Sequence, residues 1–162
     1  QGGQPIMSYN FGAGNKERVK KAFFTQFKVC TIFTSCFWLI MLLFPKLFAG
    51  IFSNNTDLIT YTAWALRIYM AGIFSLGFQV SCQQSFMALG QAKVSLLLAC
   101  LRKLILLIPL IFILPLFIQD KVFAVFLAEP ISDIVAATIT TITFMSRFNG
   151  ILNKGSKMKT AE

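Results

Sequence analysis

Four long apolar stretches constrain the fold of this chain more than any other feature. They cover approximately residues 23–45, 58–89, 94–118 and 122–146. Crossing a bilayer takes about 20 apolar residues in a helix. Lipid offers no hydrogen bonds to the backbone, so a spanning segment must pair its own backbone groups, as a helix does. The sequence therefore predicts an all-α integral membrane protein with four transmembrane helices.

The composition supports this interpretation. Hydrophobic residues make up 56% of the chain and charged residues only 13%, whereas a soluble domain carries about 25% charge. The net charge of +9 would suit nucleic acid, but the basic residues gather between the apolar stretches, as the positive-inside rule expects. We therefore expect membrane lipid as a partner, and no nucleic acid. Residues 14–22 are interpreted as a basic cytoplasmic loop, and residues 147–162 as a basic tail that frays into solvent.

The distribution of basic residues also predicts the orientation. On the side of the two chain ends lie Lys16, Arg18, Lys20, Lys21, Lys28, Lys93, Arg147, Lys154, Lys157 and Lys159. The opposite side carries Lys46 and Lys121, each with an acid nearby. We expect a multi-pass protein of the cytoplasmic (inner) membrane with a cytoplasmic C-terminus.

Catalytic and metal chemistry have little support in the sequence. The chain has no histidine, which excludes Ser-His and Cys-His nucleophile arrangements. Its four cysteines form no CxxC pair, and we interpret them as small apolar side chains rather than metal ligands. We expect neither an enzyme nor a metal site. Because the chain begins with Gln1 and no signal peptide precedes the first apolar stretch, we expect a piece of a longer protein.

Two acids, Glu129 and Asp133, lie inside the fourth apolar stretch. A charge at that depth costs roughly 2.5–3.5 kcal/mol on insertion scales, and is therefore a functional-site hypothesis. Their i, i+4 spacing places both on one helix face. Their oxygens suit Na⁺ or H⁺, so we predict an ion-coupling or substrate site. The alternative is a structural pair that a basic side chain neutralises.

Arg67, in the second stretch, is the predicted partner of these acids. Counted from the outer side, Arg67 and Glu129 each lie about nine residues, or roughly 14 Å, deep. An unpaired charge there would be expensive, so Arg67 is expected to pair with Glu129 or Asp133. The alternative is that Arg67 snorkels outward. Arg102 and Lys103, in the third stretch, are expected to snorkel toward the cytoplasm.

The second stretch also carries polar and small residues. Gln79 and Gln83 share a helix face, so they either line a polar cavity or hydrogen-bond between helices. Both remain candidates for the ion-coupling or substrate site. Gly72, Ser75 and Gly77 are expected to permit close helix packing.

Three prolines are candidate hinges. Pro109 and Pro115 lie in the third stretch, which we therefore expect to form a bent helix. Pro130 lies between the two acids and frees the carbonyl of Phe126 from its helical hydrogen bond. That carbonyl either supplies another oxygen ligand or marks a hinge.

Several motifs resemble the multidrug and toxic compound extrusion (MATE) family. The opening segment carries a pattern similar to a hallmark of that family, with Gln4, Pro5, Tyr9, Asn10 and Gly12. In such proteins it ends the eighth of twelve helices. Residues 42–52, 86–95 and 128–133 resemble later family segments in the same order.

The resemblance implies an antiporter that expels organic, often cationic, compounds in exchange for Na⁺ or H⁺, with no other cofactor. It also implies two six-helix bundles that alternate access to a central cavity. The four helices here would belong to the second bundle. Their partners would be small organic substrates and the N-terminal helices of the same transporter, which this sequence lacks.

Two other functions stay open from the sequence. A lipid-linked oligosaccharide flippase of the same broad superfamily would be favoured by abundant arginine around the central cavity, and Arg67 gives it little support. A non-transporting membrane scaffold, derived from a truncated gene, is the other alternative.

Overall fold

The computed structural model describes residues 2–159, with side chains described for residues 2–153. Every regular element in that range is helical. In chain order they are α1 (Gly3–Gly12), α2 (Lys16–Leu43), α3 (Pro45–Gly50), α4 (Thr56–Tyr69), the 3₁₀ turn η1 (Met70–Gly72), α5 (Ile73–Ala88), α6 (Ala92–Cys100), the π-helical segment η2 (Leu101–Leu107), α7 (Ile108–Phe117) and α8 (Lys121–Lys159). The prediction of an all-α chain is confirmed.

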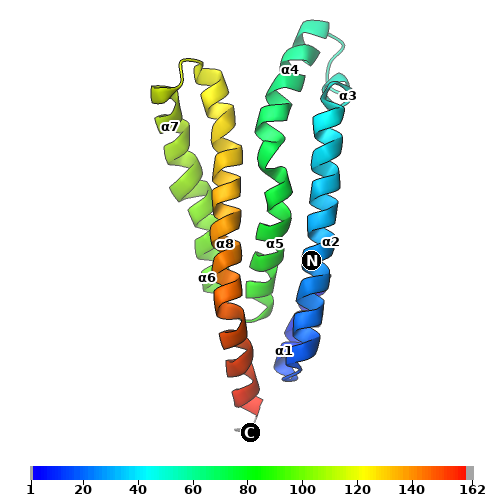
Figure 1. Ribbon diagram of the computed structural model, residues 1–162, viewed down its shortest axis with the longest axis vertical. Coiled ribbons are helices and arrows are strands. Elements are labelled where there is room, and N and C mark those ends of the chain that lie inside the picture. Colours follow the sequence, from blue (N-terminus) through cyan, green and yellow to red (C-terminus); the bar gives the residue numbers. More distant parts are fainter. Residues whose placement is uncertain (1, 160–162) are drawn as a thin grey trace.

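Four rods form an elongated bundle (Figure 1): α2, α4 continued by α5, α6 continued by α7, and α8. Each is long and apolar enough to cross a membrane, over Lys16–Leu43, Thr56–Ala88, Ala92–Phe117 and Lys121–Asn153. The four predicted apolar spans are therefore four helical rods. The short α1, the turn between α5 and α6 and the C-terminal end of α8 lie at the same end of the bundle, in the lower part of Figure 1. We call this the basic end, because the lysine-rich segments lie there.

Glycine and capping side chains form the turns between the rods. Gly14 and Gly90 have φ angles of 72° and 74°, which glycine adopts without steric cost. Asn55 caps α4, and its Oδ1 accepts hydrogen bonds from the N–H groups of Asp57 and Leu58. Asp120 Oδ1 accepts from the N–H groups of Val122 and Phe123 at 3.0 and 3.1 Å. These side chains satisfy amides that a helix start leaves unpaired.

Two segments near the basic end are more helical than predicted. The predicted loop over 14–22 is only a short turn, because α2 already begins at Lys16. The predicted fraying of the tail is wrong over the residues that the structure describes, since α8 runs on to Lys159 and Phe148 and Leu152 are buried. Lys16 Nζ also donates to Asn153 Oδ1 at 2.9 Å. Residues 160–162 of the predicted tail lie outside the described residues.

Phenylalanines form the core of the basic end. Phe23 on α2, Phe86 on α5 and Phe144 on α8 are fully buried. The ring of Phe144 lies 4.7 Å from that of Phe23 and 4.9 Å from that of Phe86, measured between centroids. Such distances suit favourable tilted and edge-to-face ring contacts. We call these three residues the phenylalanine cluster; it joins three of the four rods.

A short 3₁₀ turn interrupts the second rod, and one glycine in it and one in α5 bring the rod close to its neighbours. The sequence predicted one span over 58–89, whereas η1 separates α4 from α5. A Cβ on Gly72 would lie 2.8 Å from Pro130 Cα, and one on Gly77 would lie 3.0 Å from Thr31 Cα. Gly72 therefore permits contact with α8 and Gly77 contact with α2. The expected close packing at these two glycines is confirmed.

Candidate functional site

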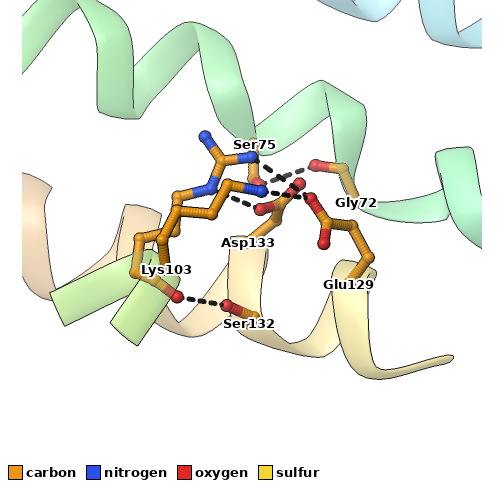
Figure 2. A network of polar contacts seen from close by, with 7 residues as sticks. Gly72, Ser75, Lys103, Glu129, Ser132 and Asp133 are labelled. Atoms are coloured by element: carbon orange, nitrogen blue, oxygen red, sulfur yellow. Dashed lines mark hydrogen bonds and ion pairs between the residues drawn. The ribbon is translucent and has the colours of Figure 1, made fainter. Parts of the chain in front are cut away.

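The two predicted acids meet two basic residues from the third rod (Figure 2). Lys103 Nζ donates to Glu129 Oε1 at 2.8 Å, and Arg102 Nε donates to Asp133 Oδ1 at 2.6 Å. A guanidinium nitrogen of Arg102 also lies 3.7 Å from Glu129 Oε1. Such charge-assisted contacts are the strong class of hydrogen bond. We call these four residues the charge cluster.

The two acids of the charge cluster come from one helix, and its two basic residues come from another. Glu129 and Asp133 are one turn apart on α8, and so project from the same face. Arg102 and Lys103 are consecutive residues of η2, a π-helical segment. π-helical segments inside α-helices are rare and are frequent at functional sites. Pro109 lies just beyond it, and since proline has no N–H, it leaves a nearby carbonyl without its α-helical donor.

The charge cluster lies beside the 3₁₀ turn η1 of the second rod. Ser132 Oγ donates to the carbonyl oxygen of Arg102 at 2.9 Å, which ties η2 to α8. Ser75 Oγ donates to the carbonyl oxygen of Gly72 at 2.7 Å. Figure 2 shows Gly72 and Ser75 beside Asp133, and a Cβ on Gly72 would lie 3.1 Å from Asp133 Cβ. The cluster thus joins two rods and lies beside the third.

The two acids of the charge cluster are buried, and the cluster is formally neutral, with two cations against two carboxylates. The exposed side-chain fractions are 4% for Asp133, 11% for Glu129, 20% for Arg102 and 52% for Lys103. Arg102 lies ten residues from the start of the 26-residue third rod, or about 15 Å along it, near the middle of a membrane. Compensation within the cluster lowers the otherwise large cost of charge at that depth.

The predicted pairing of Arg67 is wrong. Arg67 is exposed, and the acids are bound by Arg102 and Lys103, whose predicted snorkelling toward the cytoplasm is therefore also wrong. The sequence did carry a signal against the snorkelling of Arg102. Ten residues separate Arg102 from the start of its rod, which is too far for an arginine side chain to reach the membrane surface.

Replacement of Arg67 by methionine is therefore expected to leave folding nearly unchanged, within about 0.5 kcal/mol, as for other exposed positions. The measurement is thermal unfolding of the protein in detergent, compared with the parent. A loss above about 2 kcal/mol would show that Arg67 neutralises a buried acid after all.

The two predicted glutamines lie on α5, on the side of the charge cluster that faces the basic end. Gln79 is only 1% exposed, and Gln83 is half-buried. Gln79 Oε1 and Gln83 Nε2 have no hydrogen-bond partner among the described residues. A polar cavity and interhelical hydrogen bonds both stay predictions here.

The remaining candidates are the prolines and the opening motif. Pro115 lies inside α7 and Pro130 inside α8, and their hinge roles stay predictions, as does that of Pro109. The motif residues Gln4, Pro5, Tyr9, Asn10 and Gly12 all lie on α1. The buried Asn10 donates from Nδ2 to the carbonyl oxygen of Ile6 at 2.8 Å, so its side chain stabilises α1 itself.

No group of three or more His, Cys, Asp or Glu side chains converges as a metal site within the described residues. In the charge cluster both carboxylates already accept from a basic side chain. These contacts engage one oxygen of each carboxylate, Glu129 Oε1 and Asp133 Oδ1, and a further cation at either acid would lie beside the positive charge of Arg102 or Lys103.

Comparisons with known proteins agree with this arrangement. A sequence model of the MatE family matches residues 1–113. Two solved structures, an inward-facing and an outward-facing conformation of a multidrug resistance MATE family transporter of the MOP superfamily, match with TM-scores of 0.84 and 0.83. Both are 18% identical to this chain and cover 92% of it and 34% of the transporter.

A third structure, of the MATE multidrug transporter DinF-BH, is 30% identical. It matches with a TM-score of 0.81 over 92% of this chain and 33% of that transporter. The chain thus spans about one third of the length of the solved structures that it matches. No curated protein matches the sequence.

Proposed function

The chain belongs to the MatE family, and from that premise we propose that it works within a cation-coupled antiporter that exports organic, often cationic, compounds. Its four long helices make it a multi-pass membrane protein. The charge cluster is the observation that carries the proposal, because ionisable residues near mid-membrane mark ion and substrate pathways. The rest of the transporter would come from helices that this sequence does not include.

Coupling would occur at Glu129. A proton on its carboxylate removes the charge that holds Lys103, which is the most exposed member of the cluster. The more buried pair of Arg102 and Asp133 would keep η2 against α8 meanwhile. Proton uptake would thus loosen the two contacts of Glu129, with Lys103 and at 3.7 Å with Arg102, and leave the pair of Arg102 and Asp133. A ligand that favours one state shifts the population toward it.

A proton suits this site better than Na⁺. A metal cation needs several oxygen ligands, and in the charge cluster it would lie beside Arg102 and Lys103, each of which already holds one carboxylate oxygen. A proton needs one carboxylate oxygen. We therefore propose H⁺ as the coupling ion.

The similarity to an inward-facing and to an outward-facing MATE transporter structure supports a bundle that keeps its shape during transport. The TM-scores of 0.84 and 0.83 differ little. We propose that these four helices move largely as one rigid body. The loosening of the ion pairs of Glu129 would be a local change within that body. By the positive-inside rule, the basic end faces the cytoplasm, in a cytoplasmic (inner) membrane.

Arg102 adds no support to the flippase alternative, because its guanidinium is bound to Asp133 at 2.6 Å. The arginine expected to contact a lipid-linked phosphate would need a free guanidinium. Arg67 remains exposed, and a single arginine does not make an arginine-lined cavity.

Efflux of a fluorescent cationic dye from cells tests the proposal. Changing Glu129→Gln or Asp133→Asn in the full transporter is expected to lower the efflux rate at least about tenfold, because either change removes a charge that the coupling ion must meet. Asp57→Asn, at an exposed position near the start of α4, is the matched control and should retain the parent rate. The amount of protein in the membrane is measured for each variant. Parent rates in both acid variants would exclude these residues from transport.

A further inference from the structure

Three polar side chains between the charge cluster and the basic end have buried atoms without a protein partner. Gln79 Oε1, Gln83 Nε2 and Thr140 Oγ1 make no hydrogen bond among the residues that the structure describes. Gln79 is 1% exposed and Thr140 fully buried. Leaving such a group unpaired costs roughly 1–3 kcal/mol, so each of these atoms calls for a partner.

The register between α5 and α8 places these side chains together. The two helices lie side by side and run in the same direction (Figure 1). Near the middle of the bundle Gly72 lies against Pro130. At the basic end the rings of Phe86 and Phe144 lie 4.9 Å apart between centroids. Both pairs are offset by 58 in sequence, so the register is constant between them.

That register puts Gln79 and Thr140 at almost the same level. With the same offset, Gln79 is level with position 137, and Thr140 lies three residues further along α8. The separation along the axis is about 4.5 Å. Both lie on the contacting faces of the two helices, since Gln79 follows Gly72 by two turns and Thr140 follows Asp133 by two turns.

Further polar side chains lie along α5 on both sides of Gln79. Toward the charge cluster, Ser75 lies one turn from Gln79 and is 3% exposed. Toward the basic end, Gln83 lies one turn on, where Ser95 Oγ of α6 donates to its carbonyl oxygen at 3.2 Å. We call Ser75, Gln79, Gln83 and Thr140 the polar seam. It leads from Asp133 toward the turn between α5 and α6.

The chemistry of the unpartnered atoms indicates which ligand can form hydrogen bonds with them. They comprise an amide oxygen that accepts, an amide nitrogen that donates and a hydroxyl that does both. Water can satisfy all three, because it both donates and accepts hydrogen bonds. Buried waters typically bridge such otherwise unpaired polar groups.

We propose that the polar seam binds a short file of water molecules that carries protons between the charge cluster and the basic end. This route deepens the proposed function, and rests on it. The phenylalanine cluster closes the neighbouring α2 side at the level of Phe86, so the file would open beside Gln83 and Ser95, where Gln83 is half-buried.

Cysteine labelling tests the water in the seam independently of transport. A thiol reacts with a water-soluble thiol reagent as the thiolate, which requires water. In the full transporter, Gln79→Cys and Thr140→Cys are expected to react at least about tenfold faster than Val80→Cys and Thr138→Cys. The two control positions lie on the same helices, next to or near the test positions. Their side chains are exposed on the outside of the four-helix bundle, where lipid rather than water would surround them. The parent transporter, whose native cysteines include the four of this chain, sets the background, and equal rates at all four positions would overturn the proposal.

Transport tests the route itself. The double variant Gln79→Leu, Thr140→Val is expected to slow proton-driven uptake into vesicles at least about tenfold, because its side chains no longer hold water. The polar double variant Gln79→Asn, Thr140→Ser should stay near the parent rate, and Thr138→Val controls for the loss of a hydroxyl. Equal rates in the apolar and polar double variants would overturn the route. A parent without proton-driven uptake would instead overturn the proposed function, while fast labelling would still establish water in the seam.

Discussion

Replacing Arg102 with methionine is expected to cost about 3–5 kcal/mol of folding free energy, the usual loss when one partner of a buried ion pair is removed. Asp133 is 4% exposed and accepts from Arg102 Nε at 2.6 Å. Without that guanidinium, two carboxylates would face the single ammonium group of Lys103 near the middle of the membrane. The folded fraction after detergent extraction, followed by gel filtration and thermal unfolding, measures the loss.

A second change separates loss of charge balance from loss of packing. Arg102→Met combined with Asp133→Leu leaves Lys103 paired with Glu129, and is expected to recover most of the folded fraction. Lys93→Met, at an exposed position of the basic end, removes a charge without exposing an acid and should resemble the parent. A single Arg102→Met variant as stable as the parent would show that the charge cluster has no role in folding.

Replacing Gly72 with valine is expected to destabilise the protein by about 1–3 kcal/mol through overpacking and to disturb the charge cluster. A Cβ there would lie 2.8 Å from Pro130 Cα and 3.1 Å from both the Pro130 carbonyl oxygen and Asp133 Cβ. Two of these three atoms belong to the backbone, so a side-chain rotation cannot relieve the contact. The rods must separate at the level of Asp133. Thermal unfolding in detergent measures the effect.

Gly150→Val is the matched control for this change. Gly150 lies on α8 with nothing within 4 Å of an added Cβ. Since glycine is the poorest helix former after proline, valine there should leave stability equal or slightly higher. Equal melting temperatures for the Gly72 and Gly150 variants would mean that α5 and α8 do not approach as closely as described.

Much of the fold could be predicted from periodicity and composition, because each rod is long and continuously apolar. The acids of the charge cluster were also predictable, since carboxylates in such a setting are rare. Their partners were not, because Arg102 precedes Asp133 by 31 residues on another rod. Which of several basic residues reaches an acid depends on how each helix is rotated about its own axis. The depth of a residue along its rod does not determine this rotation.

Local departures from regular helix were harder still. The π-helical segment that presents Arg102 and Lys103 has no distinct sequence signature apart from the nearby Pro109. The helical extension of α8 beyond residue 146 was missed because polar residues there suggested solvent, while Phe148 and Leu152 pack in the core of the basic end. In both segments, contacts with other helices determine the backbone conformation.

Transport in vesicles that contain the purified full transporter tests the central claim, that the acids of the charge cluster couple the flux of a proton to that of the substrate. The Glu129→Gln variant is predicted to lose dye accumulation driven by a pH gradient, and to retain exchange of dye for dye without a gradient. Its folding and dye exchange thereby serve as internal controls. Full accumulation driven by the pH gradient in this variant, or accumulation in the parent driven only by a Na⁺ gradient, would contradict the account.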